Sequence, residues 1–247
     1  MSEVMLALQR SLTTLGRGKV WVYMLVPALL TLLVMIALAV FLLDNLIATF
    51  VEQPPMTWIA SWGALWLAKA LAVLGGWLVI FSASYLVAMV LTAVLILPLL
   101  LKHLSAVDYP ELARMGNDNF VAATWNSVWA AVLFVAGWLL TMPLWLIPGL
   151  GLLLPIFWMG WLNRRTFAYD ALAEHARDDE WRALRRAQAT PLLMLGLIMA
   201  LVAHVPFLGL ITPALAALAY VHFCLEALRR LRGGAVVAII DQTEGRR

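Results

Sequence analysis

Ionisable side chains are rare in this sequence, and three of them stand in apolar stretches where they could do chemistry. His204 and His222 lie in opposite arms of one predicted helical hairpin, and Glu226 follows His222 by four residues, on the same helical face. Ionisable groups at membrane depth are usually functional, so this polar set could relay a proton or coordinate a cation. The alternative is structural, because ion pairs with Arg229 and Arg230 also explain Glu226, and His204 could bond a carbonyl freed by a nearby proline.

Anion binding is the second candidate chemistry, and it would use basic residues at the ends of apolar stretches. Arg17 and Lys19 stand just before the first long apolar run, and Lys102 stands just after the second. A dianion needs several N–H donors that converge where water is excluded, since an unpaired buried charge is very costly. The more common role of such residues is anchoring at lipid headgroups. The arginines between 164 and 186 allow the same two interpretations.

The composition indicates the kind of protein that must position these residues. Hydrophobic residues make up 64% of the 247 residues and charged residues 13%, whereas soluble domains are about half apolar and a quarter charged. We therefore predict an integral membrane protein with one domain, residues 1–232, and a flexible C-terminal tail, residues 233–247. The single cysteine, Cys224, lies in an apolar stretch, which excludes a disulfide framework and a cysteine-based metal site.

Sequence motifs of enzymes and of nucleic-acid binding give no further assignment. The sequence contains no nucleophile elbow, zinc-protease motif, P-loop or dinucleotide fingerprint. We predict that the protein is not an enzyme, with no catalytic residues, no metal and no cofactor. The membrane explains its basic patches, so they do not indicate nucleic-acid binding.

The first half of the chain predicts two long transmembrane helices. An amphipathic surface helix in residues 1–18 precedes a span at Val20–Leu43, and the loop that follows, 44–57, holds acidic residues but no Lys or Arg. By the positive-inside rule, the N-terminus is cytoplasmic. The apolar stretch 58–101 exceeds the roughly 20 residues of one crossing. We divide it into an interfacial helix near 58–72, a break at Gly75-Gly76 and a span near 77–101, with a polar connector from 102 to 120.

The second half predicts two helical hairpins. Residues 126–163 contain no charged residue or histidine, yet their middle holds a Pro-Gly turn. The expected tips are Pro148 and Gly149 in the first hairpin and Pro206 and Gly209 in the second. Several arms of about 15 residues span only about 22 Å, less than a hydrocarbon core of about 30 Å. We predict re-entrant wedges, with full crossings as the alternative, and a cytoplasmic helix within the charged segment 164–190.

The order of these features resembles the CysZ/etoposide-induced-protein family. The similarity of layout spans nearly the whole chain and is most specific from about 145 to 228. The pieces that carry it are Pro27, Pro98, Ile147-Pro148-Gly149-Leu150-Gly151, Asp170, Leu184-Arg185-Arg186, Val205-Pro206-Phe207-Leu208 and Pro213-Ala214. The resemblance implies an all-α inner-membrane protein with two long transmembrane helices, two half-penetrating hairpins and amphipathic interfacial helices.

The resemblance also implies a function. Bacterial CysZ proteins move sulfate into the cytoplasm, look like channels rather than pumps, and tend to form oligomers. This sequence departs from them where sulfate is held: the family's arginine pair falls at Trp21 and Val22, and its Gly-Leu pair at Leu101 and Lys102. The Asp-Tyr-Pro tract reads Asp-Ala-Leu from Asp170 onward. The family layout implies that the ends of the two spans are adjacent, where Arg17, Lys19 and Lys102 could form a replacement anion site.

We therefore predict a protein of the bacterial inner membrane that passively transports a small anion. The expected partners are the lipid bilayer, a small anion and further copies of the chain in a homo-oligomer. The alternative is a non-transporting membrane scaffold or assembly factor. A continuous polar path through the protein would favour transport, and a dry, leucine-filled centre would favour the scaffold.

Overall fold

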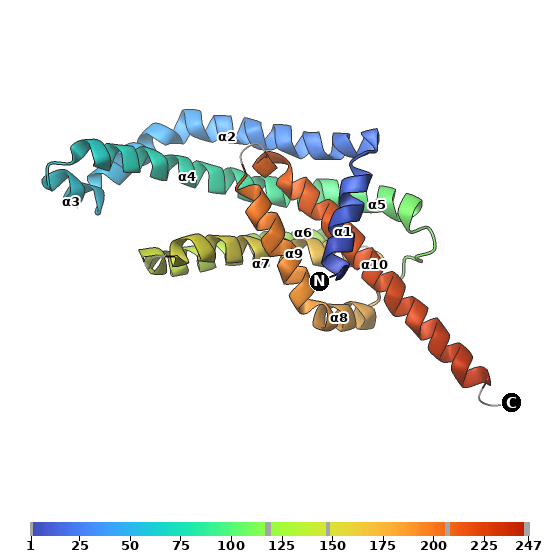
Figure 1. Ribbon diagram of the computed structural model, residues 1–247. Coiled ribbons are helices and arrows are strands. Elements are labelled where there is room, and N and C mark those ends of the chain that lie inside the picture. Colours follow the sequence, from blue (N-terminus) through green and yellow to red (C-terminus); the bar gives the residue numbers. More distant parts are fainter. Residues whose placement is uncertain (1, 117–119, 147–148, 206–207, 245–247) are drawn as a thin grey trace.

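The computed structural model describes residues 2–116, 120–146, 149–205 and 208–244, and these residues form helices and no strands (Figure 1). The predicted all-α class is confirmed. The helices are α1 (Ser2–Thr14), α2 (Gly18–Glu52), α3 (Met56–Ser61), α4 (Leu65–Leu91), the π-helical η1 (Thr92–Ile96), α5 (Leu97–Asp108), α6 (Phe120–Thr141), the 3₁₀ segment η2 (Met142–Leu146), α7 (Leu150–Ala173), α8 (Asp178–Ala187), α9 (Ala189–Ala203) and α10 (Leu208–Glu244).

Four helical stretches in the described residues are long and apolar enough to cross a membrane: 20–52, 65–108, 121–144 and 211–233. This supports a multi-pass membrane protein. Of the 18 most apolar consecutive residues in the first stretch, only 17% are buried inside the protein, whereas 83% are buried in the last stretch. Helix α10 is therefore the centre on which the other helices pack, and α2 presents most of its surface to the surroundings.

The ends of α2 and α4 that meet at α3 differ from those predicted. Helix α2 does not end at Leu43 but continues to Glu52, and α4 runs through Gly75-Gly76 without a break. A Cβ at Gly75 would lie 3.2 Å from the Phe50 ring, and one at Gly76 would lie 3.1 Å from Leu43. The glycines thus allow two helices to approach closely, as small residues do in membrane helix pairs. The chain turns instead at Gly63, whose φ is +85°.

The long second span contains a change of helix type. The π-helical η1 lies between α4 and α5 and directly precedes Pro98, which cannot donate a backbone hydrogen bond. Helix α5 then continues to Asp108, so Lys102 and His103 lie inside the helix and not in the predicted connector.

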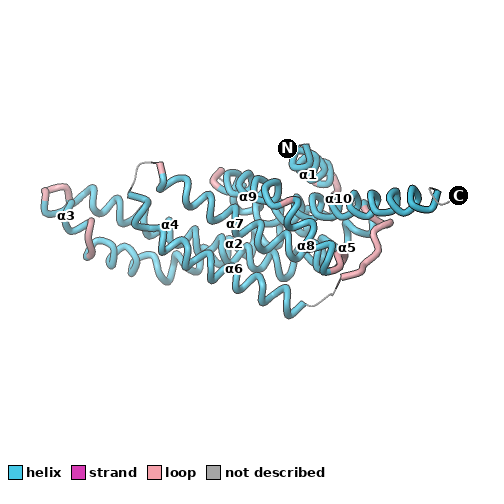
Figure 2. The backbone as a smooth tube through the Cα atoms, turned by 90° about the horizontal axis from the view of Figure 1, so that it is seen from below, coloured by secondary structure: helices cyan, strands magenta, loops and turns pink. Residues whose placement is uncertain are grey.

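Helices α6 and α7 form the first hairpin, which runs beside the α2–α4 pair (Figures 1 and 2). Its tip is directed toward the end of that pair where α3 lies, but it does not reach as far as α3. The close contact of its arms is fixed at Gly137, where a Cβ would lie 2.3 Å from the Trp158 ring. At the tip, Gly149 has a φ of +89° and precedes α7, while Pro148 lies outside the described residues. Helix α7 does not stop at the predicted arginine pair but continues to Ala173.

Helices α9 and α10 form the second hairpin, which crosses the others obliquely (Figure 1). Its expected tip residue Pro206 lies outside the described residues, and Gly209 lies in the first turn of α10. The predicted cytoplasmic helix in 164–190 is divided between the end of α7 and the separate α8, and α8 meets α9 at an angle of 71°. Helix α10 runs on to Glu244, so the segment predicted as a tail is helical to that residue, and the domain boundary at 232 stays a prediction.

Candidate functional site

The predicted anion residues lie where α2 begins and α5 ends. These ends are adjacent, because the rings of Tyr23 and His103 lie 6.2 Å apart. Arg17 donates two hydrogen bonds of 2.7 Å to the two carboxylate oxygens of Asp108, and these bonds raise the pKa of the guanidinium. Its charge is therefore neutralised within the protein. Lys102 is exposed on α5, and the side chain of Lys19, in the first turn of α2, lies outside the described part of the structure.

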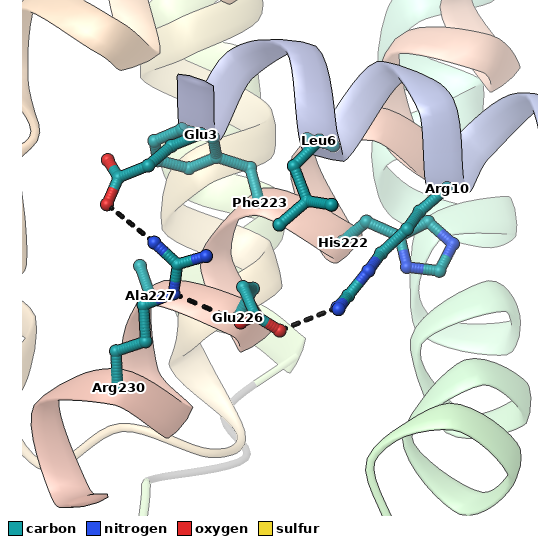
Figure 3. Close-up of a pocket in the computed structure, with 9 residues that line it drawn as sticks. Glu3, Leu6, Arg10, His222, Phe223, Glu226, Ala227 and Arg230 are labelled. Atoms are coloured by element: carbon teal, nitrogen blue, oxygen red, sulfur yellow. Dashed lines mark hydrogen bonds and ion pairs between the residues drawn. The ribbon is translucent and has the colours of Figure 1, made fainter. Parts of the chain in front are cut away.

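The predicted polar pair His222 and Glu226 belongs to a network that docks α1 on α10. Figure 3 shows the Glu226 carboxylate between Arg10 and Arg230. Its oxygens lie 2.6 Å from Arg10 Nη1, 2.6 Å from Arg229 Nη2 and 3.1 Å from Arg230 Nε. A carboxylate that accepts from three guanidiniums is fully engaged, so this geometry matches an ion-pair network more closely than a cation ligand.

The ring nitrogens of His222 are also occupied. Nε2 lies 2.9 Å from Thr14 Oγ1, and Nδ1 lies 3.1 Å from Tyr109 Oη. The cavity beside this network, between α1 and α10, measures about 10 Å³, which is room for one water molecule at most. His204 lies apart, in α9's C-cap, with Nδ1 2.7 Å from the carbonyl oxygen of Ala200.

A buried polar stripe, formed by Asn163, Thr166 and Asp170, runs along one face of α7. The three side chains follow each other by three and four residues and are 0%, 1% and 7% exposed. Asn163 accepts from the Tyr85 hydroxyl at 3.4 Å and donates to the Gly196 carbonyl at 3.5 Å. These bonds are long, so the amide is held weakly.

The lower part of the stripe has fewer partners than its polar atoms require. Asp170 accepts one hydrogen bond, 3.3 Å from Ser127 Oγ on α6, while its Oδ1 and the Thr166 hydroxyl have no partner in the described part of the chain. Burial raises the pKa of the Asp170 carboxyl to about 8, against the opposing effect of the Ser127 bond. At neutral pH this carboxyl is therefore mainly protonated and uncharged.

Further unpartnered polar atoms occur in the helices around α7. Among the described residues these are the buried hydroxyls of Ser84 on α4, Thr92 on η1 and Thr124 on α6. The π-helical η1 contacts both α6 and α7. Buried polar groups without partners are uncommon in native proteins, and each one calls for a solute, an ordered water or strain. The centre of the helices is therefore polar at several levels and not uniformly leucine-filled.

The chain is similar in sequence to one family of membrane proteins. Residues 7–213 match the model of the family described as sulfate transporter CysZ/etoposide-induced protein 2.4. The chain belongs to this family. No curated protein and no solved structure matches the chain. The family assignment made from the sequence layout is thereby confirmed.

Family membership does not restore the sulfate-holding arginines that the sequence lacks. Trp21 and Val22, at the positions of the CysZ arginine pair, are 43% and 60% exposed on α2. Neither side chain can donate to an anion through a charged group. The basic groups of this chain lie at other positions.

A second concentration of basic residues lines a cavity of about 310 Å³ between α6, α7, α8 and α9. Its wall includes Arg164, Arg165 and Arg185 together with Trp161, Tyr169 and Trp181. From the sequence, these arginines are expected to recruit anions or lipid headgroups, but no local pattern indicates that arginines of two separate helices line one cavity. The polar stripe was missed as well, although its spacing of three and four residues was a visible signal.

Proposed function

We propose that this member of the CysZ/etoposide-induced protein family passively transports a small anion. The proposal rests on the family, whose description includes a sulfate transporter, and on one observation that favours transport over a dry scaffold. That observation is the polar stripe of α7 with its unpartnered neighbours. In a membrane protein a polar group without a partner costs free energy, and such groups mark solute and ion pathways.

The chemistry of the stripe suits an anion better than a cation. Asn163 keeps a second amide N–H beside the one that it donates to Gly196. Thr166 offers a hydroxyl and a protonated Asp170 offers an O–H, whereas the hydroxyl of Ser127 is already donated to Asp170. A path lined in this way has donors and, at neutral pH, little fixed negative charge. A sulfate-like oxyanion or a halide is therefore the substrate class we expect.

The topology we propose places α2 and α4–α5 across the membrane and the two hairpins as re-entrant wedges. Three observations support it: the α6–α7 tip ends short of α3, the α9–α10 hairpin lies obliquely, and the basic residues gather at the end away from α3 (Figure 1). The N-terminus then lies in the cytoplasm of a bacterial cell, with the protein in the inner membrane as a homo-oligomer.

Labelling of the hairpin tip tests this topology. In a Cys224→Ala background, a Leu144→Cys variant, at an exposed position of η2 beside the tip, should resist a membrane-impermeant thiol reagent added from outside. Ser61→Cys, at the end of α3, should react. Reaction at both positions would mean that α6 and α7 cross the membrane fully, which the 24-residue length of the 121–144 stretch allows.

Ion flux in proteoliposomes tests the transport function. Thr166→Val keeps the shape of the side chain and removes one hydroxyl, so flux of sulfate or chloride should fall about fivefold if one hydrogen bond of about 1 kcal/mol is lost. Thr190→Val, at an exposed position of α9, is the matched control and should leave flux unchanged. Absence of flux of sulfate, thiosulfate and chloride in the unmodified protein would refute the proposal.

The second candidate function is a non-transporting membrane scaffold. The exposed, uncharged Trp21 and Val22 at the CysZ arginine positions favour it, because a retained wedge can persist after an anion site is lost. In that case Thr166→Val would have no effect on any ion flux, and the protein would instead alter vesicle shape or the recovery of another membrane complex.

A further inference from the structure

The cavity lined by Arg164, Arg165 and Arg185, here called the arginine cavity, differs from the basic clusters that are held in ion pairs. Arg10, Arg17 and Arg232 each pair with a carboxylate, at 2.6, 2.7 and 3.0 Å. Arg164, Arg165 and Arg185 have no ion-pair partner in the described part of the chain, and no acidic residue is among those that line the cavity.

The positive charges of Arg165 and Arg185 repel each other. Burial lowers the pKa of Arg165, and the positive charge of Arg185 lowers it further. In addition, the Nε donor of Arg165 is buried and has no acceptor among the described residues. Two like charges brought close together are unfavourable, and an anion bound between them would remove the repulsion.

Aromatic side chains hold Arg185 at the cavity wall. The guanidinium of Arg185 lies 5.1 Å from the centre of the Trp181 ring, a distance at which a cation–π contact forms. Tyr169 meets the same indole edge-on, with ring centres 5.8 Å apart. The remaining wall is apolar and includes Leu133 and Leu192. The volume of about 310 Å³ falls at the lower end of the range for small-molecule sites, so a compact ligand or headgroup fits.

The cavity is separate from the polar stripe. On α7 the cavity is lined by residues such as Trp161, Arg165 and Ala168, which follow each other by four and three residues. The stripe residues 163, 166 and 170 lie on the opposite face of the same helix. A ligand in the cavity would therefore not occupy the path that we propose for transport.

We propose that Arg164, Arg165 and Arg185 form a binding site for a tetrahedral oxyanion at the arginine-rich end of the helices. The shared chemistry is a phosphate or sulfate group that accepts from forked guanidinium donors. Its source is either the headgroup of an anionic phospholipid, whose glycerol would meet the Trp181 and Leu192 wall, or a free oxyanion. The site goes beyond the transport function, because it requires no passage across the membrane.

Tryptophan fluorescence of the full-length protein in nanodiscs tests the site. Inorganic phosphate and sulfate are titrated into phosphatidylcholine nanodiscs, and phosphatidylglycerol is introduced in place of phosphatidylcholine in a second arm. The fluorescence change that the unmodified protein shows and the Trp181→Phe variant lacks is assigned to the cavity. A response to free oxyanion identifies a soluble ligand, and a response to phosphatidylglycerol alone identifies a lipid headgroup.

Two variants with equal loss of charge make the result specific. Arg185→Gln, on the exposed surface of α8, should raise the dissociation constant at least tenfold, as expected when a hydrogen bond to a charged group is lost. The next residue, Arg186, does not line the cavity, so Arg186→Gln should change the dissociation constant less than twofold. Equal effects of both variants, or no response in either arm, would overturn the proposal. Neither outcome bears on flux, which is measured separately.

Discussion

We expect anion flux to fall as the pH rises through about 8, because Asp170 then acquires a negative charge beside the proposed path. Burial raises the pKa of this carboxyl to about 8, so the uncharged form is about 90% populated at pH 7 and about 10% at pH 9. If only the uncharged form lets an anion pass, flux at pH 9 is about one tenth of that at pH 7. If the charged carboxylate were needed instead, flux would rise with pH over the same interval.

Proteoliposomes with equal pH on both sides and labelled sulfate or chloride are the assay. Asp170→Asn is the matched variant, because the amide keeps the size of the side chain and stays uncharged. It should transport at about the wild-type rate at pH 7 and should lose the decline between pH 7 and 9. A decline of the same size in Asp170→Asn would show that another group is responsible, and a wild-type rate that increases with pH would refute the reasoning.

The stability of the protein gives a second measure of the same group. A carboxyl whose pKa is raised on folding stabilises the folded state fully below its unfolded value of 3.8, and this contribution is lost as the pH rises through about 8. The midpoint of thermal unfolding should therefore decrease less with pH in Asp170→Asn than in the unmodified protein over that interval.

Three further predictions concern the packing around the site. Gly137→Ala should lower the stability by about 1–3 kcal/mol, measured by thermal unfolding, because the new methyl would meet the Trp158 ring at 2.3 Å. Arg232→Ala should cost about 1–3 kcal/mol, because the buried carboxylate of Glu180 loses its closest guanidinium and keeps only that of Arg177 at 3.7 Å. Limited proteolysis should then cut near α8, and unchanged proteolysis would contradict this. His175 is fully buried and neutral, and burial with the charges of two nearby arginines lowers its pKa to about 4, so its contribution to stability should be lost as the pH falls from 6.5 to about 4. A His175→Gln variant that kept this acid sensitivity would show that the histidine is not its source.

The sequence predicted the classes of element well and their ends poorly. Membrane character, the two hairpins and the family follow from apolar runs and turn residues, which are local signals. The break expected at Gly75-Gly76 was wrong because a glycine that interrupts a helix and a glycine that admits a neighbouring helix look alike in one chain. The stop expected at Arg164-Arg165 was wrong because charge ends an apolar run without ending a helix, and α7 continues to Ala173.

The site residues show the same limit. The sequence offers Asp170 as part of a charged segment, and only the contact with Ser127 on another helix reveals that it is buried. Conversely, Arg17 looks like a free cation until Asp108, 91 positions later, is found beside it. Partners far apart in the sequence decide which ionisable groups remain available, and no spacing rule within one helix carries that information.

Close contacts between helices lie on both sides of the polar stripe, toward the N-terminal end of α7 (above) and just beyond its C-terminal end (below). Above the stripe, α7 crosses α9 so closely that a Cβ at Gly196 would lie 2.3 Å from the Gly160 carbonyl oxygen. Below it, Arg232 of α10 donates to the carbonyl of His175 at 2.7 Å and to both carboxylate oxygens of Glu180 at 3.0 Å. The hydroxyl of Thr166 has no partner among the described residues, and a water or a solute that accepted from it would remove that cost. The polar atoms of His222 and Glu226 are already bonded, and the open hydroxyl of Thr166 is the better place to look for a passing anion.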